Sequence, residues 1–313
     1  MVVVLVVVGN DLNSKMKYDI TILTESCYVN PTETDVYTDN VLLEDKLIID
    51  ALEAQGLKVY RTNWDNPDFD FTTTKYVLFR AIWDYFDRFP EFSKWLTVVS
   101  QQTKLINPSE QIIWNMDKHY LKDLEDNGVN IVKTDYIEIG DTRSLKQSIL
   151  ATGWEHVILK PAVSGGARHT YKIKPGESDE HETIFKELIA EEAMLLQPFQ
   201  KNIIEKGEVS FMVFGGKYSH AVLKKAKAGD FRVQDDHGGT IHPYEASPKE
   251  IEFVQNVMAQ CKTVPVYGRV DVTWDNNDNL ALVELEIIEP ELWFRESSNS
   301  PKMLAEAVLD FIS

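Results

Sequence analysis

The sequence has 313 residues, enough for two or three packed units of ~100–150 residues each. Hydrophobic residues make up 43% and charged residues 26%, which is typical of a soluble globular protein. The formal net charge is −18, and a phosphate backbone would repel such a surface. The composition therefore argues against nucleic acid as a general partner.

The cysteines and the first residues bear on localisation. Cys27 and Cys261 are too few for a disulfide framework, which favours a reducing, cytoplasmic setting. The apolar run Met1–Gly9 is about half as long as a membrane crossing requires, and it lacks the basic start of a secretion signal. Residues 1–15 are therefore either a strand-like extension or an upstream misassigned start, and we place the first domain edge at Met16.

Residues 16–114 alternate between predicted strands and helices. Short runs rich in β-branched residues predict strands, and apolar residues spaced three and four apart predict helices. This alternation is typical of an open parallel sheet with crossover helices, a Rossmann-like α/β unit. The predicted elements are strand 19–23, a helix capped by Asn40 and stopped at Gly56, strands 57–60 and 76–80, helix 91–102 and strand 104–106.

The pattern then changes to hairpins and helices, an α+β arrangement. Gly215-Gly216 separates two strand patterns, which is a hairpin signal. The predicted elements are helix 111–127 carrying Lys118, strands 131–133, 156–160 and 170–173, helix 179–192, strand 195–198, hairpin 208–214 with 217–224, helix 248–260, hairpin 268–274 with 280–288, and a final helix from Pro301.

A lysine and a glycine-rich loop form the first candidate site. Lys160 ends a predicted strand and precedes Ser164-Gly165-Gly166. Glycines let backbone amides approach an anion closely, and lysine adds a compact charge for phosphate oxygens. The sequence has neither a Walker A motif nor a dinucleotide fingerprint. The loop fits phosphate binding, but taken alone it fits a flexible hairpin with a surface lysine equally well.

Acidic residues on the last predicted hairpin form the second candidate site. Glu284 and Glu286 are two apart on a strand and share one face. Alternation alone favours a solvated outer face. Asp271 on the preceding, paired strand shifts the interpretation toward Mg²⁺, because carboxylate oxygens on one face suit this ion and buried carboxylates need a counter-charge.

The third candidate is weaker. Arg232 offers bidentate recognition of phosphate or carboxylate and precedes the glycines of His237-Gly238-Gly239, although an ordinary polar loop would look the same. The histidines lack metal-ligand spacing, and no signature of covalent catalysis occurs.

Taken together and in this order, these segments resemble the ATP-grasp superfamily. The match runs from Asn115 to the C-terminus. It implies a two-lobed ATP-grasp domain, with lobes 115–195 and 196–313, after a pre-ATP-grasp domain at 16–114. Segments 80–85, 114–118 and 284–290 look most like the glutathione-synthetase-type branch, and within it the cycloserine-biosynthesis-like proteins.

The resemblance implies a role for each candidate. Many members have asparagine where this chain has Glu286, which changes the charge of the metal site but keeps a possible ligand. One or two Mg²⁺ ions are expected, with Mn²⁺ as a possible substitute. The implied roles are phosphate binding by Lys118, Lys160, Ser164, Gly165 and Gly166; adenine reading at Gln197 and Phe199; ribose binding by Glu205 or Glu208; catalysis by Lys160 and Arg232; and metal ligation by Asp271, Glu284 and Glu286.

The implied activity is an ATP- and Mg²⁺-dependent ligase. It would convert a small-molecule carboxylate into an acyl phosphate for attack by an amine, a thiol or a similar nucleophile. Arg80, Arg269 and Arg295 are candidates for binding that carboxylate, and each could instead be a surface salt-bridge partner. Cyclisation or phosphorylation of one metabolite, and nucleotide binding without turnover, remain alternatives. The oligomeric state stays open, a homodimer included.

Overall fold

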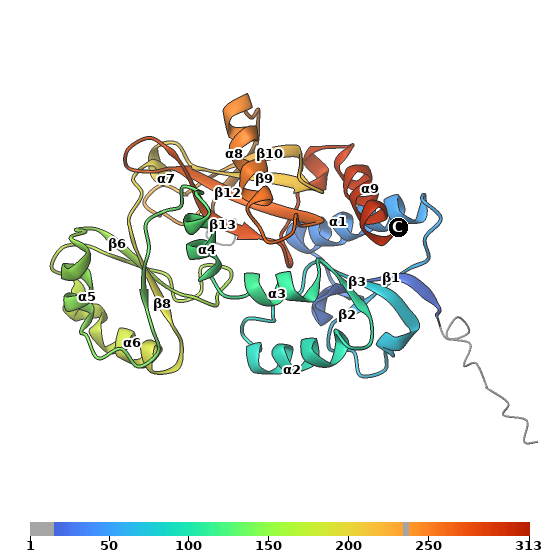
Figure 1. Cartoon of the computed structure of the whole chain (residues 1–313), viewed down its shortest axis with the longest axis horizontal. Helices are drawn as coiled ribbons and strands as arrows, with labels where there is room; N and C mark the ends of the chain where they lie inside the picture. Colours follow the sequence, from blue (N-terminus) through green and yellow to red (C-terminus); the bar gives the residue numbers. More distant parts are fainter. Residues whose placement is uncertain (1–15, 234–237) are drawn as a thin grey trace, which may run out of the picture.

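Three β-sheets organise residues 16–233 and 238–313, which are the residues that the computed structural model describes. The first sheet lies in the N-terminal part of the chain, the second in a small lobe and the third in a large lobe (Figure 1). The predicted extension 1–15 and His237 lie outside the described residues. None of the helices within the described ranges has both the length and the apolar composition that a membrane crossing requires.

The N-terminal sheet is parallel throughout, with strand order β2-β1-β3-β4. The predicted parallel pairing with crossover helices is therefore confirmed. The first helix begins earlier than predicted, because Asp35 rather than Asn40 caps it, accepting a 2.8 Å bond from the Thr38 amide. The elements are β1 (Tyr18–Thr24), α1 (Val36–Glu53), β2 (Val59–Asn63), β3 (Thr74–Phe79), α2 (Phe89–Val99) and β4 (Lys104–Ile106).

Helices cover both faces of this sheet. Val77 and Phe79 of β3 pack against α2, whereas Leu78 between them packs on the opposite face. That opposite face is shared by α1 and the last helix, α9 (Ser300–Ile312), which lie side by side (Figure 1). The end of the chain, which the sequence placed in the large lobe, therefore packs against the N-terminal sheet as well as against Met212 and Phe214 of the large lobe.

The small lobe is an antiparallel sheet with strand order β5-β8-β6-β7, covered by two helices. Its last strand ends at Pro198, so the predicted boundary between residues 195 and 196 falls inside a strand. The sequence also missed β5 and α5. The elements are β5 (Asp135–Ile137), α5 (Leu145–Thr152), β6 (Val157–Pro161), β7 (Tyr171–Ile173), α6 (Ser178–Glu191) and β8 (Met194–Pro198).

The large lobe is an antiparallel sheet with strand order β11-β10-β9-β12-β13. Both predicted hairpins are present, and β9 pairs with β12 to join them. Gly215 and Gly216 turn the first hairpin with φ angles of 52° and 75°, a region that favours glycine. The elements are α7 (Asn202–Glu205), β9 (Glu208–Phe214), β10 (Lys217–Lys225), β11 (Thr240–Tyr244), α8 (Pro248–Ala259), β12 (Tyr267–Trp274) and β13 (Leu280–Glu286).

The predicted helix 111–127 is wrong, because the chain forms two helices with a turn at 116–119. They are α3 (Ser109–Asn115) and α4 (Tyr120–Asp126). The Asn115 amide donates 2.8 Å to the Leu285 carbonyl and accepts 3.1 Å from the Ile287 N–H, and the Lys118 N–H donates 2.9 Å to the Ala162 carbonyl. These tertiary bonds override the helical pattern. The predicted strand 131–133 is reduced to one bridge at Ile131.

Asn107 ties the N-terminal unit to the large lobe. Its side chain is fully buried, donates to the carbonyls of Tyr267 at 2.9 Å and Ile287 at 2.8 Å, and accepts 2.6 Å from the Val266 N–H. The Asn107→Ala variant leaves these three backbone groups without partners. We expect the free energy of unfolding to fall by about 2–4 kcal/mol, measured by urea denaturation.

The matched control is Asn277→Ala, at an exposed position in the turn between β12 and β13. A shift of the unfolding midpoint no larger than that of this control would contradict the role given to Asn107.

Candidate functional site

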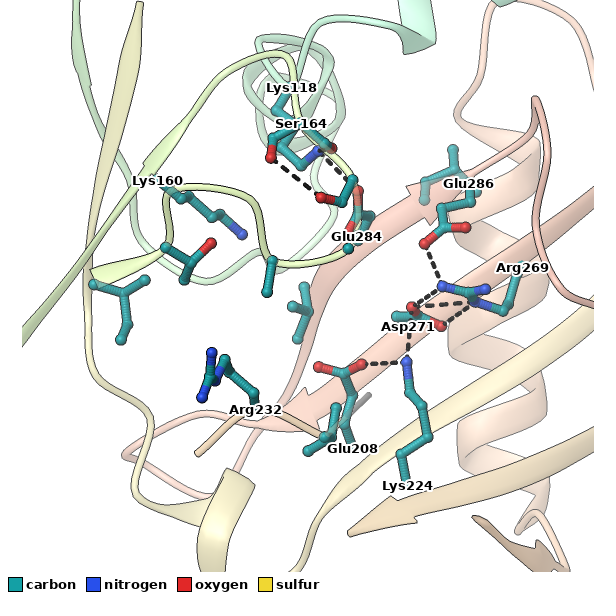
Figure 2. A pocket seen from close by; sticks show the side chains of 18 of the residues that line it. Lys118, Lys160, Ser164, Glu208, Lys224, Arg232, Arg269, Asp271, Glu284 and Glu286 are labelled. Atoms are coloured by element: carbon teal, nitrogen blue, oxygen red, sulfur yellow. Dashed lines mark hydrogen bonds and ion pairs between the residues drawn. The ribbon is translucent and has the colours of Figure 1, made fainter. Parts of the chain in front are cut away.

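A cleft of about 320 Å³ lies where the three sheets meet. Its walls come from the segment after β3, from the turn between α3 and α4, from β6 and the following loop, from the end of β8, and from one face of the large-lobe sheet. Most of the predicted site residues line this single cavity (Figure 2). Segments far apart in sequence therefore converge on one place.

The two predicted lysines enter the cleft from different elements. Lys118 lies in the turn between α3 and α4, and its ammonium contacts the Ser164 carbonyl and, at 3.0 Å, the Glu284 carboxylate. Lys160, near the end of β6, is half-buried and points into the cavity (Figure 2). Burial lowers the pKa of Lys160, and the Glu284 carboxylate opposes this shift. Two cations thus lie near one another without a full complement of anions, which suits a phosphate chain.

The glycine loop lies against the N-terminal unit. A Cβ added to Gly165 would lie 2.5 Å from Cε1 of Phe86, so glycine at this position permits the contact. Gly166 and Ala167 have φ angles of 55° and 58°, and the hydroxyl of Ser164 donates 3.1 Å to the Arg168 carbonyl. Successive residues with positive φ in a small-residue loop offer amides to an anion. Ser164, Gly165 and Gly166 all line the cleft.

The predicted acidic residues share one face of the large-lobe sheet. Asp271 of β12 is paired in register with Glu284 of β13, and Arg269 is paired with Glu286. Lys224 of β10 is paired in register with Glu208 of β9. Strand β9 is separated from β13 only by β12. Charged side chains of both signs therefore form a band across four neighbouring strands (Figure 2).

Asp271 is the centre of this band. One carboxylate oxygen accepts 2.6 Å from the Ser210 hydroxyl and 2.9 Å from Arg269 Nε. The other accepts 2.8 Å from Arg269 and 3.1 Å from Lys224, whose ammonium also lies 2.6 Å from Glu208. Burial alone would raise the pKa of Asp271, but Arg269 and Lys224 together hold it well below its ordinary value. Asp271 is therefore ionised, and both of its carboxylate oxygens already accept hydrogen bonds from protein groups.

Glu286 and Glu289 are the opposite case. Burial, opposed by Arg269 and reinforced by Glu284, raises the pKa of Glu286 to about 8. Burial and the Glu284 charge raise the pKa of Glu289 to about 7. Burial and the neighbouring Glu284 charge therefore oppose ionisation of these two carboxyls.

Two of the three predicted ligands, Glu284 and Glu286, are placed to bind Mg²⁺, whereas Asp271 is occupied by protein cations. Among the described residues, no group of three acidic, histidine or cysteine side chains is spaced to hold a metal as it stands. Asp271 would have to exchange Lys224 or Arg269 for the ion. Glu284 and Glu286 are partly exposed to the cleft and supply hard oxygens on one face, and a dication would favour the ionised form of Glu286 that burial and Glu284 oppose.

The residues predicted to contact the adenine base lie at the end of β8. Gln197 lines the cleft and donates 2.9 Å to the Thr134 hydroxyl. Phe199 lines it as well, although its N–H already donates 2.8 Å to the His156 carbonyl, and the Lys172 ammonium lies 3.4 Å from its ring centroid. Glu208 lines the cleft, whereas Glu205 is exposed and does not.

The predicted arginines divide into two groups. Arg232 lines the cleft, paired at 2.7 Å with Asp230, and Arg269 lines it within the charged band. Arg80 and Arg295 do not line it, contrary to the prediction. Arg80 is 2% exposed and lies 2.5 Å from Glu44, because the strand that it follows ends inside the protein.

Arg295 pairs at 2.7 Å with Glu291, four residues earlier. It therefore supports a residue of the cleft wall without reaching the cavity itself.

Sequence reasoning missed one wall of the cleft. Trp83, Tyr85 and Phe86 come from the segment after β3, and Glu289 and Trp293 come from the segment after β13. The resemblance drew on segments 80–85 and 284–290, but it assigned no role to these side chains. The spacing of the two segments does not indicate that they meet.

Comparisons with known proteins agree with this geometry. Residues 20–107 match the family model described as the N-terminal domain of the D-cycloserine synthetase DcsG. The chain is 25% identical over 281 residues to the cycloserine biosynthesis protein DcsG of Streptomyces lavendulae, which covers 84% of this chain and 92% of that protein.

Two solved structures extend the comparison. The crystal structure of D-cycloserine synthetase DcsG superposes with a TM-score of 0.83 and 21% identity, covering 94% of this chain and 99% of the other. The ATP-grasp ligase PsnB, in complex with a minimal precursor, Mg and ADP, superposes with a TM-score of 0.61 and 14% identity, covering 93% and 97%.

The raised pKa of Glu286 predicts a specific pH dependence of stability. The carboxyl has a pKa of about 8 in the folded protein and an ordinary value of 4.5, so between these values the folded state binds more protons than the unfolded chain. This group therefore makes the protein less stable as pH rises through that window. In metal-free buffer, we expect the stability of Glu286→Gln relative to the unsubstituted protein to increase from pH 5 to pH 8.5, measured by urea denaturation.

Glu252→Gln, an exposed change on α8, is the control and should show no such trend. A stability difference for Glu286→Gln that stays constant over this pH range would show that Glu286 is ionised throughout.

Proposed function

The chain belongs to the ATP-grasp superfamily of ligases, and we propose that it uses ATP and Mg²⁺ to activate a small-molecule carboxylate for attack by an amine or similar nucleophile. One observation carries the proposal. Lys118 and Lys160 meet the carboxylates of Glu284 and Glu286 in a single cleft, beside a glycine loop. Such a site suits a triphosphate with its metal ion, because the lysines would face the phosphates and the carboxylates would face the metal.

In this proposal, Lys118, Lys160 and the amides of 164–166 bind the phosphates. The segment with Gln197 and Phe199 holds the base, and Glu208 is supported over Glu205 as the ribose ligand because only Glu208 lines the cleft. Glu284 and Glu286 would hold the metal, with Asp271 as a third ligand if it exchanged Lys224 or Arg269 for the ion. Bound Mg²⁺ would offset the negative charge that develops on the phosphates.

The chemistry requires two displacements. An oxygen of the substrate carboxylate attacks the γ-phosphorus, and the bond to the bridging oxygen breaks to release ADP. The nucleophile then attacks the carbonyl carbon of the acyl phosphate, loses a proton, and expels inorganic phosphate. Arg232 and Arg269, which line the cleft, stabilise negative charge on the transferred group.

Water must be kept from the acyl phosphate between these steps. Contact between the 164–166 loop and Phe86 supports closure over the cleft from the side of the N-terminal unit. Most of the rate enhancement would come from positioning and charge, since no protein nucleophile is required.

Cyclisation of one substrate is a second candidate, favoured by a specific observation. The similarity to the D-cycloserine synthetase DcsG extends over nearly the full chain. The same residues would activate the carboxylate, and the attacking nitrogen would belong to the same molecule. Mass analysis of products separates the two, because a ligase joins two substrates whereas a cyclase releases water from one.

We expect Lys160→Ala and Glu284→Ala to lower ADP release by at least about 10²-fold, because each removes a charge that offsets phosphate or holds the metal. ADP release is measured with Mg²⁺ and mixtures of amino acids and hydroxy acids. Circular dichroism should show an unchanged fold.

Lys146→Ala, an exposed change on α5, is the control and should retain full activity. Full activity in Lys160→Ala or Glu284→Ala would contradict the proposed site.

A further inference from the structure

The guanidinium of Arg269 has one nitrogen that is open to the cleft. Its Nε donates 2.9 Å to Asp271, and its Nη2 donates 2.8 Å to Asp271 and also donates to Glu286. Within the described part of the chain, Nη1 forms no hydrogen bond, and it is not one of the buried atoms that lack a partner. Because Arg269 lines the cavity, Nη1 is the nitrogen that remains to bind an anion there.

The indole of Trp293 covers the face of this guanidinium. Arg269 Cζ lies over the ring, 5.2 Å from its centroid, which is within the range of a cation–π contact. Trp293 is 3% exposed, and among the described residues nothing accepts a hydrogen bond from its buried Nε1. A buried indole usually finds such an acceptor. The orientation of this ring therefore depends on its packing and on the contact with Arg269.

Buried contacts hold the segment that carries Trp293. The Leu292 N–H donates 2.7 Å to Glu44, which is paired at 2.5 Å with Arg80. His220 Nε2 lies 3.0 Å from the Leu292 carbonyl and 3.2 Å from the Trp293 carbonyl. The φ of 43° and ψ of 48° at Trp293 lie in the left-handed region, which a bulky residue seldom adopts. Strain that the surrounding structure maintains is a mark of a functional position.

Metal binding would weaken the other contacts of Arg269. Asp271 and Glu286, the two carboxylates that accept its hydrogen bonds, are also the proposed metal ligands on its side of the cleft. An ion at either one would compete with the guanidinium for the same oxygens. The face of an indole offers no oxygen to Mg²⁺, so the contact with Trp293 would persist. This contact can therefore keep Arg269 in place when the metal is bound.

We propose that Trp293 is a positioning residue, which holds the Arg269 guanidinium so that Nη1 faces the phosphoryl group as it is transferred. The role rests on the proposed function, in which Arg269 stabilises negative charge on that group. Trp293 acts through Arg269 and not on the reacting atoms. Its indole also belongs to the hydrophobic cluster shared by α1 and α9, so a purely structural role predicts an effect on stability alone.

Kinetics separate positioning from packing. Trp293→Leu keeps an apolar side chain and removes the aromatic face. ADP release is measured with Mg²⁺, ATP and the mixtures of amino acids and hydroxy acids. We expect kcat to fall about 10–100-fold with KM for ATP unchanged, because a misplaced charge loses its effect in the transition state. Trp293→Phe keeps an aromatic face and should retain kcat within about threefold.

Leu304→Ala is the matched control, because Leu304 is fully buried in the same cluster and does not line the cleft. It should lower the free energy of unfolding in urea and leave kcat unchanged. In the Arg269→Lys background, Trp293→Leu should lower kcat by no more than about threefold, because its effect passes through the guanidinium. Equal losses in both backgrounds, no loss in either, or an equal loss in Leu304→Ala would overturn the inference.

Nuclear magnetic resonance of the arginine Nε–H groups tests the contact without substrate or metal. The Arg269 signal is identified by its absence in Arg269→Lys. We expect the indole to shift this signal upfield, a shift that Trp293→Phe retains and Trp293→Leu loses. If no acid supports ADP release, the proposed function fails and this spectrum decides the inference. Loss of the shift in Trp293→Leu supports it, and an unchanged signal overturns it. Trp293→Met takes the place of Trp293→Leu if the latter does not fold.

Discussion

The site depends on the buried ion network that Asp271 forms with Arg269 and Lys224. Two cations and one hydroxyl occupy both oxygens of this carboxylate, and the same cations extend to Glu208 and Glu286. Removing one member would leave a buried charge uncompensated, at a cost of about 3–5 kcal/mol. Because the members belong to four adjacent strands, sheet register alone sets their spacing. The floor of the cleft is therefore rigid before any ligand arrives.

The remaining walls are attached to this floor by contacts between distant segments. Asn115 bonds to both sides of Glu286 in sequence, through Leu285 and Ile287, and so fixes the turn that carries Lys118. The glycine loop, by contrast, contributes a carbonyl to Lys118 and otherwise lies against the Phe86 ring. A phosphoryl-transfer site requires preorganised charges, which the charged face of the large-lobe sheet supplies. It must also let substrates enter, which a loop of small residues with few contacts permits.

Local pattern was enough to predict much of this. The strands of the large lobe follow from alternation and turn residues, and the shared face of Glu284 and Glu286 follows from a spacing of two. Lys118 lines the cleft, but the helix predicted to carry it does not form, because the bonds that break the helix come from residues about 170 positions away. Arg80 could have bound the substrate or formed a salt bridge, and it pairs with Glu44 for the same reason. A strand that ends in the interior delivers its last side chain to a buried partner, and Glu44 gave no sign of that role.

Arg80 and the cleft wall after β13 are connected by one chain of buried contacts. Arg80 holds Glu44, Glu44 holds the Leu292 N–H, and the next residue is the strained Trp293. A prediction from sequence expects an arginine near a cleft to bind substrate directly, whereas here it acts three contacts away. An unfavourable backbone at Trp293 persists only because a buried ion pair and His220 oppose its relaxation. The buried Trp293 indole also belongs to the hydrophobic cluster that α1 and α9 share, so the same segment contributes to packing. Its consequence is an indole fixed in the cleft wall, facing the Arg269 guanidinium at 5.2 Å from the ring centroid, in a segment whose position depends on contacts between residues far apart in the sequence.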